Sequence, residues 1–124
     1  MSAYTIKSTL EKYFQDNWTQ TPIGYEGVAF DYSSEDDFIS LKYVGIANKS
    51  MTGSKITNAQ LQIFCYAKNS TLSYKLADDI SNFISCKDLS NDIHTLTAQQ
   101  FGSATNLDNE FFETVITVEV NKYS

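Results

Sequence analysis

Residues 59–67 read Ala-Gln-Leu-Gln-Ile-Phe-Cys-Tyr-Ala, and this stretch decides the fold. Small or apolar side chains occupy every second position, and glutamine or aromatic side chains lie between them. A period of two indicates a β-strand with two unlike faces. We therefore predict a strand over about Lys55–Ala67 in a sheet that is covered on one side only. The second face is then open to water or to a partner subunit, and it carries Asn58, Gln60, Gln62, Phe64 and Tyr66.

Other stretches on either side of this strand show related patterns. Phe38–Ala47 and Glu110–Asn121 alternate between apolar and polar residues and predict two more strands. Asp92–Gln99 alternates less strictly and predicts a weaker strand. The segments between them are rich in polar and turn-forming residues, so we expect connections there. These connections are a hairpin loop at Asn48–Ser54, a turn at Lys87–Asn91 and a loop at Phe101–Asn109.

Two stretches have helical periodicity instead. Apolar residues recur at spacings of three and four over Tyr4–Asn17, and again from Asn69 or Ser70 to about Ser85. The order is helix, strand, strand, helix, strand, strand. This order predicts one α+β domain over residues 1–124, with a mainly antiparallel four-stranded sheet and two helices packed on one face.

The segment Thr19–Tyr32 follows the first predicted helix, and Pro22 ends any helical pattern at that point. The segment is rich in aromatic residues and glycine, so we predict an ordered arm and not a linker. Trp18, Tyr25 and Phe30 are its expected structural anchors against apolar surface.

The charge of the chain argues against some partners. Its net charge is −6, and all nine basic residues are lysine. Nucleic-acid binding through phosphates requires clustered Lys and Arg, so the composition opposes it, and it also opposes binding to an anionic membrane. The chain has no apolar run long enough for a membrane span and no signal-peptide pattern. We expect a cytosolic protein whose two cysteines are reduced.

The residues that could carry chemistry do not form a recognisable set. His94 is the only histidine, and a nucleophilic pair would require Cys65 or Cys86 beside it. The acidic runs Glu35–Asp37 and Asp78–Asp79 lack the spacing of a calcium loop or of converging carboxylates. We therefore expect no enzyme activity, no metal site and no cofactor.

Assembly with other proteins is the remaining interpretation, because a polar-aromatic sheet face lies beside a long loop and an acidic surface. A small RNA- or ligand-binding module that uses Phe64 and Tyr66 as a stacking platform is an alternative. The candidate interface residues are Glu35, Asp36, Asp37, Met51, Gln60, Gln62, Phe64 and Tyr66.

The chain resembles the tail terminator, or tail completion, proteins of long-tailed bacteriophages of the lambda and HK97 type. The resemblance covers nearly the whole chain and rests on the order of its elements and on four short segments. These are the helix that ends near Trp18, the arm segments Thr21–Tyr25 and Gly27–Phe30, the strand Leu61–Tyr66 and the helix Tyr74–Ile80.

This resemblance implies a structural virion protein that is assembled in the host cytoplasm and lies at the head-proximal end of the tail. It implies a homo-oligomeric ring, usually a hexamer, that caps the tail tube and stops its polymerisation. The implied partners are the major tail tube protein and a head-completion or neck protein, while DNA passes through the ring without specific binding. A head–tail neck or connector protein is a neighbouring alternative.

Overall fold

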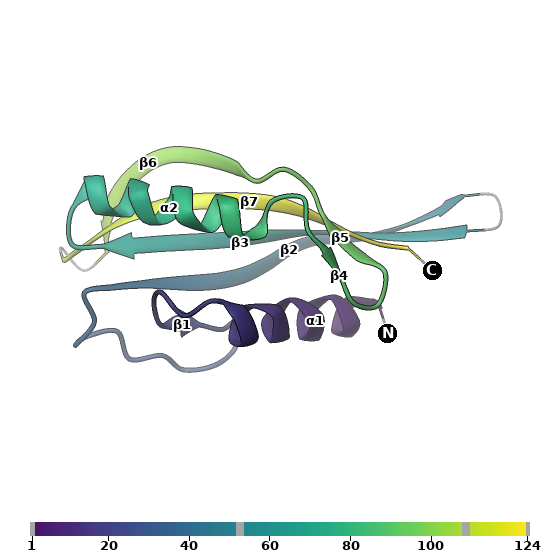
Figure 1. Cartoon of the computed structure of the whole chain (residues 1–124), viewed down its shortest axis with the longest axis horizontal. Helices are drawn as coiled ribbons and strands as arrows, with labels where there is room; N and C mark the ends of the chain where they lie inside the picture. The colour runs from purple at the N-terminus through teal and green to yellow at the C-terminus, as the bar shows by residue number, and fades with distance from the viewer. Residues whose placement is uncertain (1, 52–53, 108–109, 124) are drawn as a thin grey trace.

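The computed structural model describes residues 2–51, 54–107 and 110–123, and it describes side chains for residues 4–45, 56–100 and 110–123. Two helices, α1 (Ser2–Asn17) and α2 (Ser70–Ile84), lie over one face of a curled sheet (Figure 1). The strands of this sheet are β1 (Ile23–Gly24), β2 (Asp37–Met51), β3 (Ser54–Ala67), β4 (Asp88–Leu89), β5 (Ile93–Thr95), β6 (Gln99–Leu107) and β7 (Phe111–Tyr123).

The prediction of a four-stranded sheet is wrong, although the α+β class and the placement of both helices on one face agree with the structure. The described residues form a seven-stranded sheet with the order β1-β2-β3-β7-β5-β4, and β6 also pairs with β7. β1 runs parallel to β2, so the sheet is mixed. The three long strands that the alternation predicted, β2, β3 and β7, form its centre.

The strand count was too low because several connections are themselves strands. β2 and β3 pair as far as Met51 opposite Ser54, so most of the expected loop Asn48–Ser54 is hairpin, while Thr52 and Gly53 lie outside the described residues. The expected loop Phe101–Asn109 is largely β6, which pairs with β7 at Gln99–Phe101 and again at Thr105–Leu107; positions 108 and 109 again lie outside the described residues. Backbone pairing with a neighbour produces these strands without an alternating sequence.

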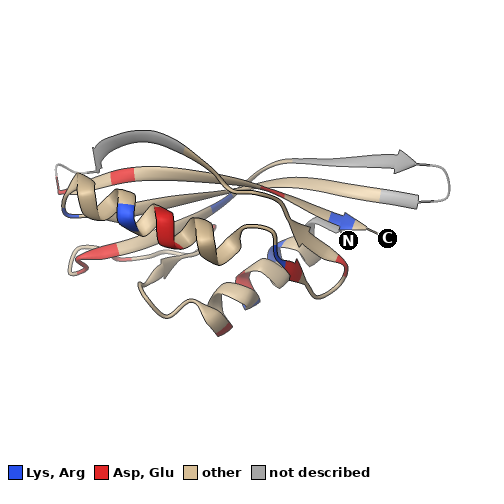
Figure 2. Ribbon diagram, turned by 45° about the horizontal axis from the view of Figure 1, so that its top comes forward, with Lys and Arg blue, Asp and Glu red and all other residues tan. Residues whose placement is uncertain are grey.

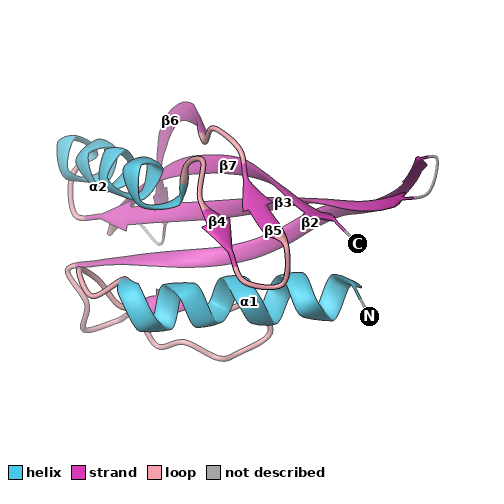
Figure 3. Ribbon diagram, turned by 45° about the vertical axis from the view of Figure 1, so that its right-hand side comes forward, coloured by secondary structure: helices cyan, strands magenta, loops and turns pink. Residues whose placement is uncertain are grey.

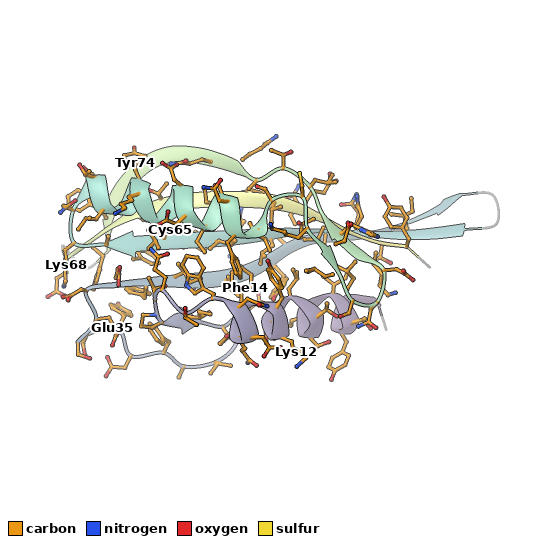
Figure 4. All side chains as sticks on the ribbon, in the orientation of Figure 1. Lys12, Phe14, Glu35, Cys65, Lys68 and Tyr74 are labelled. Carbon is orange, nitrogen blue, oxygen red and sulfur yellow. The ribbon has the colours of Figure 1, made fainter. Side chains whose placement is uncertain are left out.

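A first core lies between the helices and the sheet. Ile6, Leu10 and Phe14 of α1 are at most 1% exposed, and Leu61 and Ile63 of β3 are fully buried. Figure 4 shows Phe14 between α1 and the sheet, whereas Lys12 points away from it. The other members of this core come from β2, α2, β5 and β7, and they include Ile39, Leu41, Ala77, Ile80, Ile84, Ile93, Ile116, Val118 and Val120.

Local chemistry fixes the position of α2. Asn69 is the residue before α2. Its side chain accepts a hydrogen bond from the Leu72 N–H at 2.8 Å and thereby caps the N-terminus of the helix. Ser73 is fully buried, but its hydroxyl donates to the Cys65 carbonyl at 2.9 Å and also contacts the Thr114 hydroxyl at 2.8 Å. These bonds satisfy the buried polar groups and hold α2 over β3 and β7. The β4–β5 hairpin then extends from β7 toward α1 (Figure 3).

Candidate assembly interface

The arm after α1 covers the first part of the outer edge of β2. The Ile39 N–H donates to the Pro22 carbonyl at 3.1 Å, next to the short parallel strand β1. Four residues farther along, the Tyr43 N–H donates to a carboxylate oxygen of Glu26 at 2.9 Å. Gly27 follows at a φ of 80°, a left-handed conformation that glycine adopts readily. A backbone strand and a side chain therefore block the edge of β2 as far as Tyr43.

Past this edge, the arm continues over the face of the sheet that the helices leave uncovered. Six aromatic side chains pack there in what we call the aromatic cluster: Phe30, Tyr32, Phe38, Phe64, Tyr66 and Phe111. The Phe38 ring stacks between Tyr32 and Tyr66, with ring-centroid distances of 5.1 and 4.7 Å. The Lys68 ammonium lies 4.1 Å from the Phe111 ring centroid and covers the cluster at its end.

The aromatic cluster corrects the expectation that Tyr66 and Phe64 lie on an open face. Tyr66 is only 8% exposed, and Phe64 is half-buried against the cluster. The Tyr66 hydroxyl donates to a Glu113 carboxylate oxygen at 2.7 Å, and burial raises the pKa of the phenol above its usual value. Alternation assigned these residues to the correct face, but it does not reveal that the arm covers that end of the face.

The rest of the uncovered face is polar. Gln60 is exposed and Gln62 is half-buried, and they lie in register with Glu119 and Thr117 of β7. A pocket of about 560 Å³ opens here, lined by Gln60, Cys86, Leu96, Thr97, Gln99, Thr117 and Glu119. Its lining offers amides, hydroxyls, a thiol and one carboxylate beside a single leucine, so it resembles a hydrated surface more than a site for an apolar ligand.

The acidic turn, Glu35–Asp37, lies at the end of the molecule where β3 leads into α2. Asp36 and Asp37 line a pocket of about 350 Å³ together with Lys68, Lys75 and Asp79. Burial raises the pKa of Asp37, and the charge of Asp36 raises it further. Glu35 is half-buried in the turn, where its N–H donates to the Tyr32 carbonyl. In Figure 2 the lysines are spread over several elements of the described chain and form no basic stripe.

The three expected anchors hold the arm at three points. Trp18 is 8% exposed, packs edge-on against Phe83 and donates its indole N–H to the Thr21 hydroxyl at 2.9 Å. Tyr25 packs against the first core, where burial and then the charge of Glu11 raise its pKa. Phe30 packs against Phe38 in the aromatic cluster, with 5.4 Å between ring centroids.

The structure gives each candidate catalytic residue a different environment. Cys65 is fully buried in the first core, where burial raises the pKa of its thiol. Cys86 is exposed and contacts the Thr97 hydroxyl, while His94 bonds to the Asp88 carboxylate at 2.7 Å. No group of three or more metal-ligating side chains occurs among the described residues. Within the same part of the chain, no helix is long and apolar enough to cross a bilayer.

Exposed apolar residues on the arm and on α2 were not predicted as surface. Val28 is 63% exposed and Leu72 is 49% exposed. Val28 lines a pocket on the arm together with Tyr25 and Phe30. Leu72 lines the pocket of about 350 Å³ beside the acidic turn. Their apolar side chains gave no sequence signal that separates them from core residues. Met51, another interface candidate, is the last residue of β2, and its side chain lies outside the described residues.

Comparison with known proteins identifies the fold. No family model matches the chain, and no curated protein matches its sequence. A chain of the virion of a native gene transfer agent particle has the same fold, with a TM-score of 0.70 and 10% identity over 95% of this chain and 94% of that chain. A second solved structure, of a protein without a functional name, has a TM-score of 0.62 and 12% identity over 98% of this chain and 95% of that chain.

Proposed function

We propose that this chain is a structural protein of a phage-like virion, and specifically a tail terminator. The observation that carries the proposal is the shared fold with a chain of a gene transfer agent virion, which extends over 95% of this chain. The resemblance of the arm segments and of the element order to tail terminator proteins supports the finer assignment. Low sequence identity is compatible with a structural role, because packing and strand pairing tolerate many substitutions.

The distribution of chemical groups supports a structural role. Cys65 is buried, Cys86 contacts Thr97 and His94 bonds to Asp88, and the described residues contain no group of three or more metal-ligating side chains. The described surface offers a polar sheet face, exposed apolar residues on the arm and on α2, and strand edges without a partner strand among the described residues. These features suit contacts between proteins better than binding of a small substrate.

In this role, copies of the chain form a ring, usually of six, on the end of a completed tail tube. The ring contacts the last layer of tube protein and stops its addition, and its other side receives a head-completion or neck protein. The particle's DNA passes through the centre. The dispersed lysines and the net charge of −6 favour passage without specific binding.

A capping assay with purified components tests this function. Preformed tail tubes from the element that encodes this chain are incubated with the chain, and fresh tube protein is then added. A terminator leaves tube lengths unchanged in negative-stain images, whereas tubes without the chain keep growing. A neck protein would not stop growth at the tube end, so continued elongation with the chain bound would contradict the terminator role.

A further inference from the structure

Among the described residues, the backbone edges of two long strands, β2 and β6, differ in how they are protected. Edge strands present free N–H and C=O groups, and natural proteins commonly protect them with charges, prolines, bulges or covering segments. β1 and Glu26 cover the outer edge of β2 as far as Tyr43. Beyond Val44, where the register shifts, no described residue pairs with that edge over residues 45–51. In the described part of the chain, the outer edge of β6 likewise has no partner strand.

The sequence of β6 gives that edge little protection. Residues 99–107 read Gln-Gln-Phe-Gly-Ser-Ala-Thr-Asn-Leu and contain neither a charged residue nor a proline. A register shift between Phe101 and Thr105 divides its pairing with β7 into two segments. The distal part of β2, residues 45–51, contains a single charge, Lys49. Both edges are thus chemically able to accept a strand.

The register shows which N–H groups point outward on β2. Ile39 and Tyr43 donate away from β3, so outward N–H groups alternate along β2 before the shift. One additional residue between Val44 and Ala47 then moves the outward positions to Asn48 and Ser50. These two N–H groups lie beyond the edge that Glu26 covers.

The same alternation applies to β6. Along each strand, the backbone N–H groups point alternately to one neighbouring strand and to the other. The registers of β2 with β3, of β3 with β7 and of β7 with β6 therefore decide which residues of β6 face β7. These residues are Gln99, Phe101, Thr105 and Leu107. The outward positions between them therefore include Gln100 and Asn106. A neighbouring strand would meet outward-facing N–H groups on both edges.

We propose that the distal edge of β2, residues 45–51, pairs with the outer edge of β6 in a second copy of this chain. Strand direction alternates along β2, β3, β7 and β6. When a copy is repeated by rotation, its β6 therefore runs antiparallel to the neighbour's β2, and one sheet continues from copy to copy. The contact is head-to-tail, because two different edges meet, and such contacts generate rings when the rotation closes.

The position of the two edges sets the offset between copies. β6 lies against the Phe111–Thr117 half of β7, whereas the β2–β3 hairpin extends from the opposite end of the sheet (Figure 1). Pairing therefore requires neighbouring copies to be displaced along the strands. Strands that are inclined to the axis provide such a displacement in closed barrels.

Hydrogen exchange on the assembled full-length protein tests this pairing. The pairing rests on the proposed ring function and specifies how neighbouring copies contact each other. Exchange in peptides that cover residues 45–51 and 99–107 should slow by about tenfold or more on assembly, because their outward N–H groups become bonded. The region around Tyr43 should change little, since Glu26 already bonds its N–H. Rings in which neither peptide gains protection would overturn the pairing but leave the ring function intact.

Proline variants provide a second test. Asn48→Pro and Gln100→Pro each remove one outward N–H but keep the bonds within the chain's own sheet, and Asn48→Ala and Gln100→Ala are the matched controls. Each proline should raise the dissociation constant between copies by about tenfold or more, and the alanines should not. Prolines that assemble like their alanine controls would contradict the proposal. A wild-type chain that never assembles, even on tail tubes, would instead overturn the ring function itself.

Discussion

The two faces of the sheet are covered by different kinds of structure. Helices α1 and α2 cover one face, and its buried side chains come from regular elements with clear periodicity. The irregular arm covers one end of the other face, and its aromatic cluster combines loop residues such as Phe30 and Tyr32 with Phe38, Tyr66 and Phe111. The first core defines the fold, whereas the second decides how much of the sheet remains open to partners.

The largest effect is expected in the helix-covered core. Phe14 is fully buried and its ring lies 5.1 Å from that of Phe83. Phe14→Ala should lower the free energy of unfolding by about 3–5 kcal/mol, since it leaves a large cavity. Urea unfolding followed by the fluorescence of Trp18, the only tryptophan, measures this change. A loss below about 1 kcal/mol would contradict the burial of Phe14.

A smaller effect is expected in the aromatic cluster. Phe38 is 2% exposed and contacts Tyr32 and Tyr66, but the arm that covers it is irregular. Phe38→Ala should cost about 3 kcal/mol, at the lower end of the range for such truncations, because a loop collapses into a cavity more easily than a helix does. It should also make the arm sensitive to limited proteolysis. Phe14→Ala should not do so when the two variants are compared under conditions in which their free energies of unfolding are equal. Equal protease sensitivity would remove the distinction between the two cores.

A single hydrogen bond in the cluster should have a smaller effect again. Tyr66→Phe removes the hydroxyl that donates to Glu113 and keeps the ring. The expected loss is about 1–2 kcal/mol, because a carboxylate loses a donor in a partly buried site. Chemical denaturation of Tyr66→Phe, Glu113→Gln and the double variant gives the coupling energy between the two groups. Additive losses would show that the bond contributes nothing to stability.

The smallest effect concerns the acidic turn and depends on pH. The pKa of Asp37 is raised in the folded protein, mainly by burial and then by Asp36. The folded state therefore retains this proton more strongly, and stability falls as the pH rises from the ordinary pKa through the raised one. Asp37→Asn should flatten that part of the stability–pH curve and slightly stabilise the protein at neutral pH. A stability–pH curve for Asp37→Asn that is identical to that of the wild-type chain would reject the pKa shift.

Periodicity explains what could be predicted from the sequence. Leu61, Ile63 and Cys65 alternate on β3 and lie in the first core, and α1 and α2 form close to their predicted bounds. The strand β6 was missed because Gln-Gln-Phe-Gly-Ser-Ala-Thr-Asn-Leu has no apolar alternation and becomes a strand by pairing with β7. The cover over Tyr66 was missed for another reason. Alternation assigns a residue to a face, whereas a long-range contact with Tyr32 and Phe38 decides whether that face is open.

The length of the tails made without this chain tests the central claim most directly. The gene is deleted from the genome that encodes it, and any tails that this genome produces are measured by electron microscopy. A terminator predicts tubes that grow well beyond their normal length and carry no heads, with normal length restored when the wild-type chain is supplied. Tails of normal length in the deletion would contradict the account.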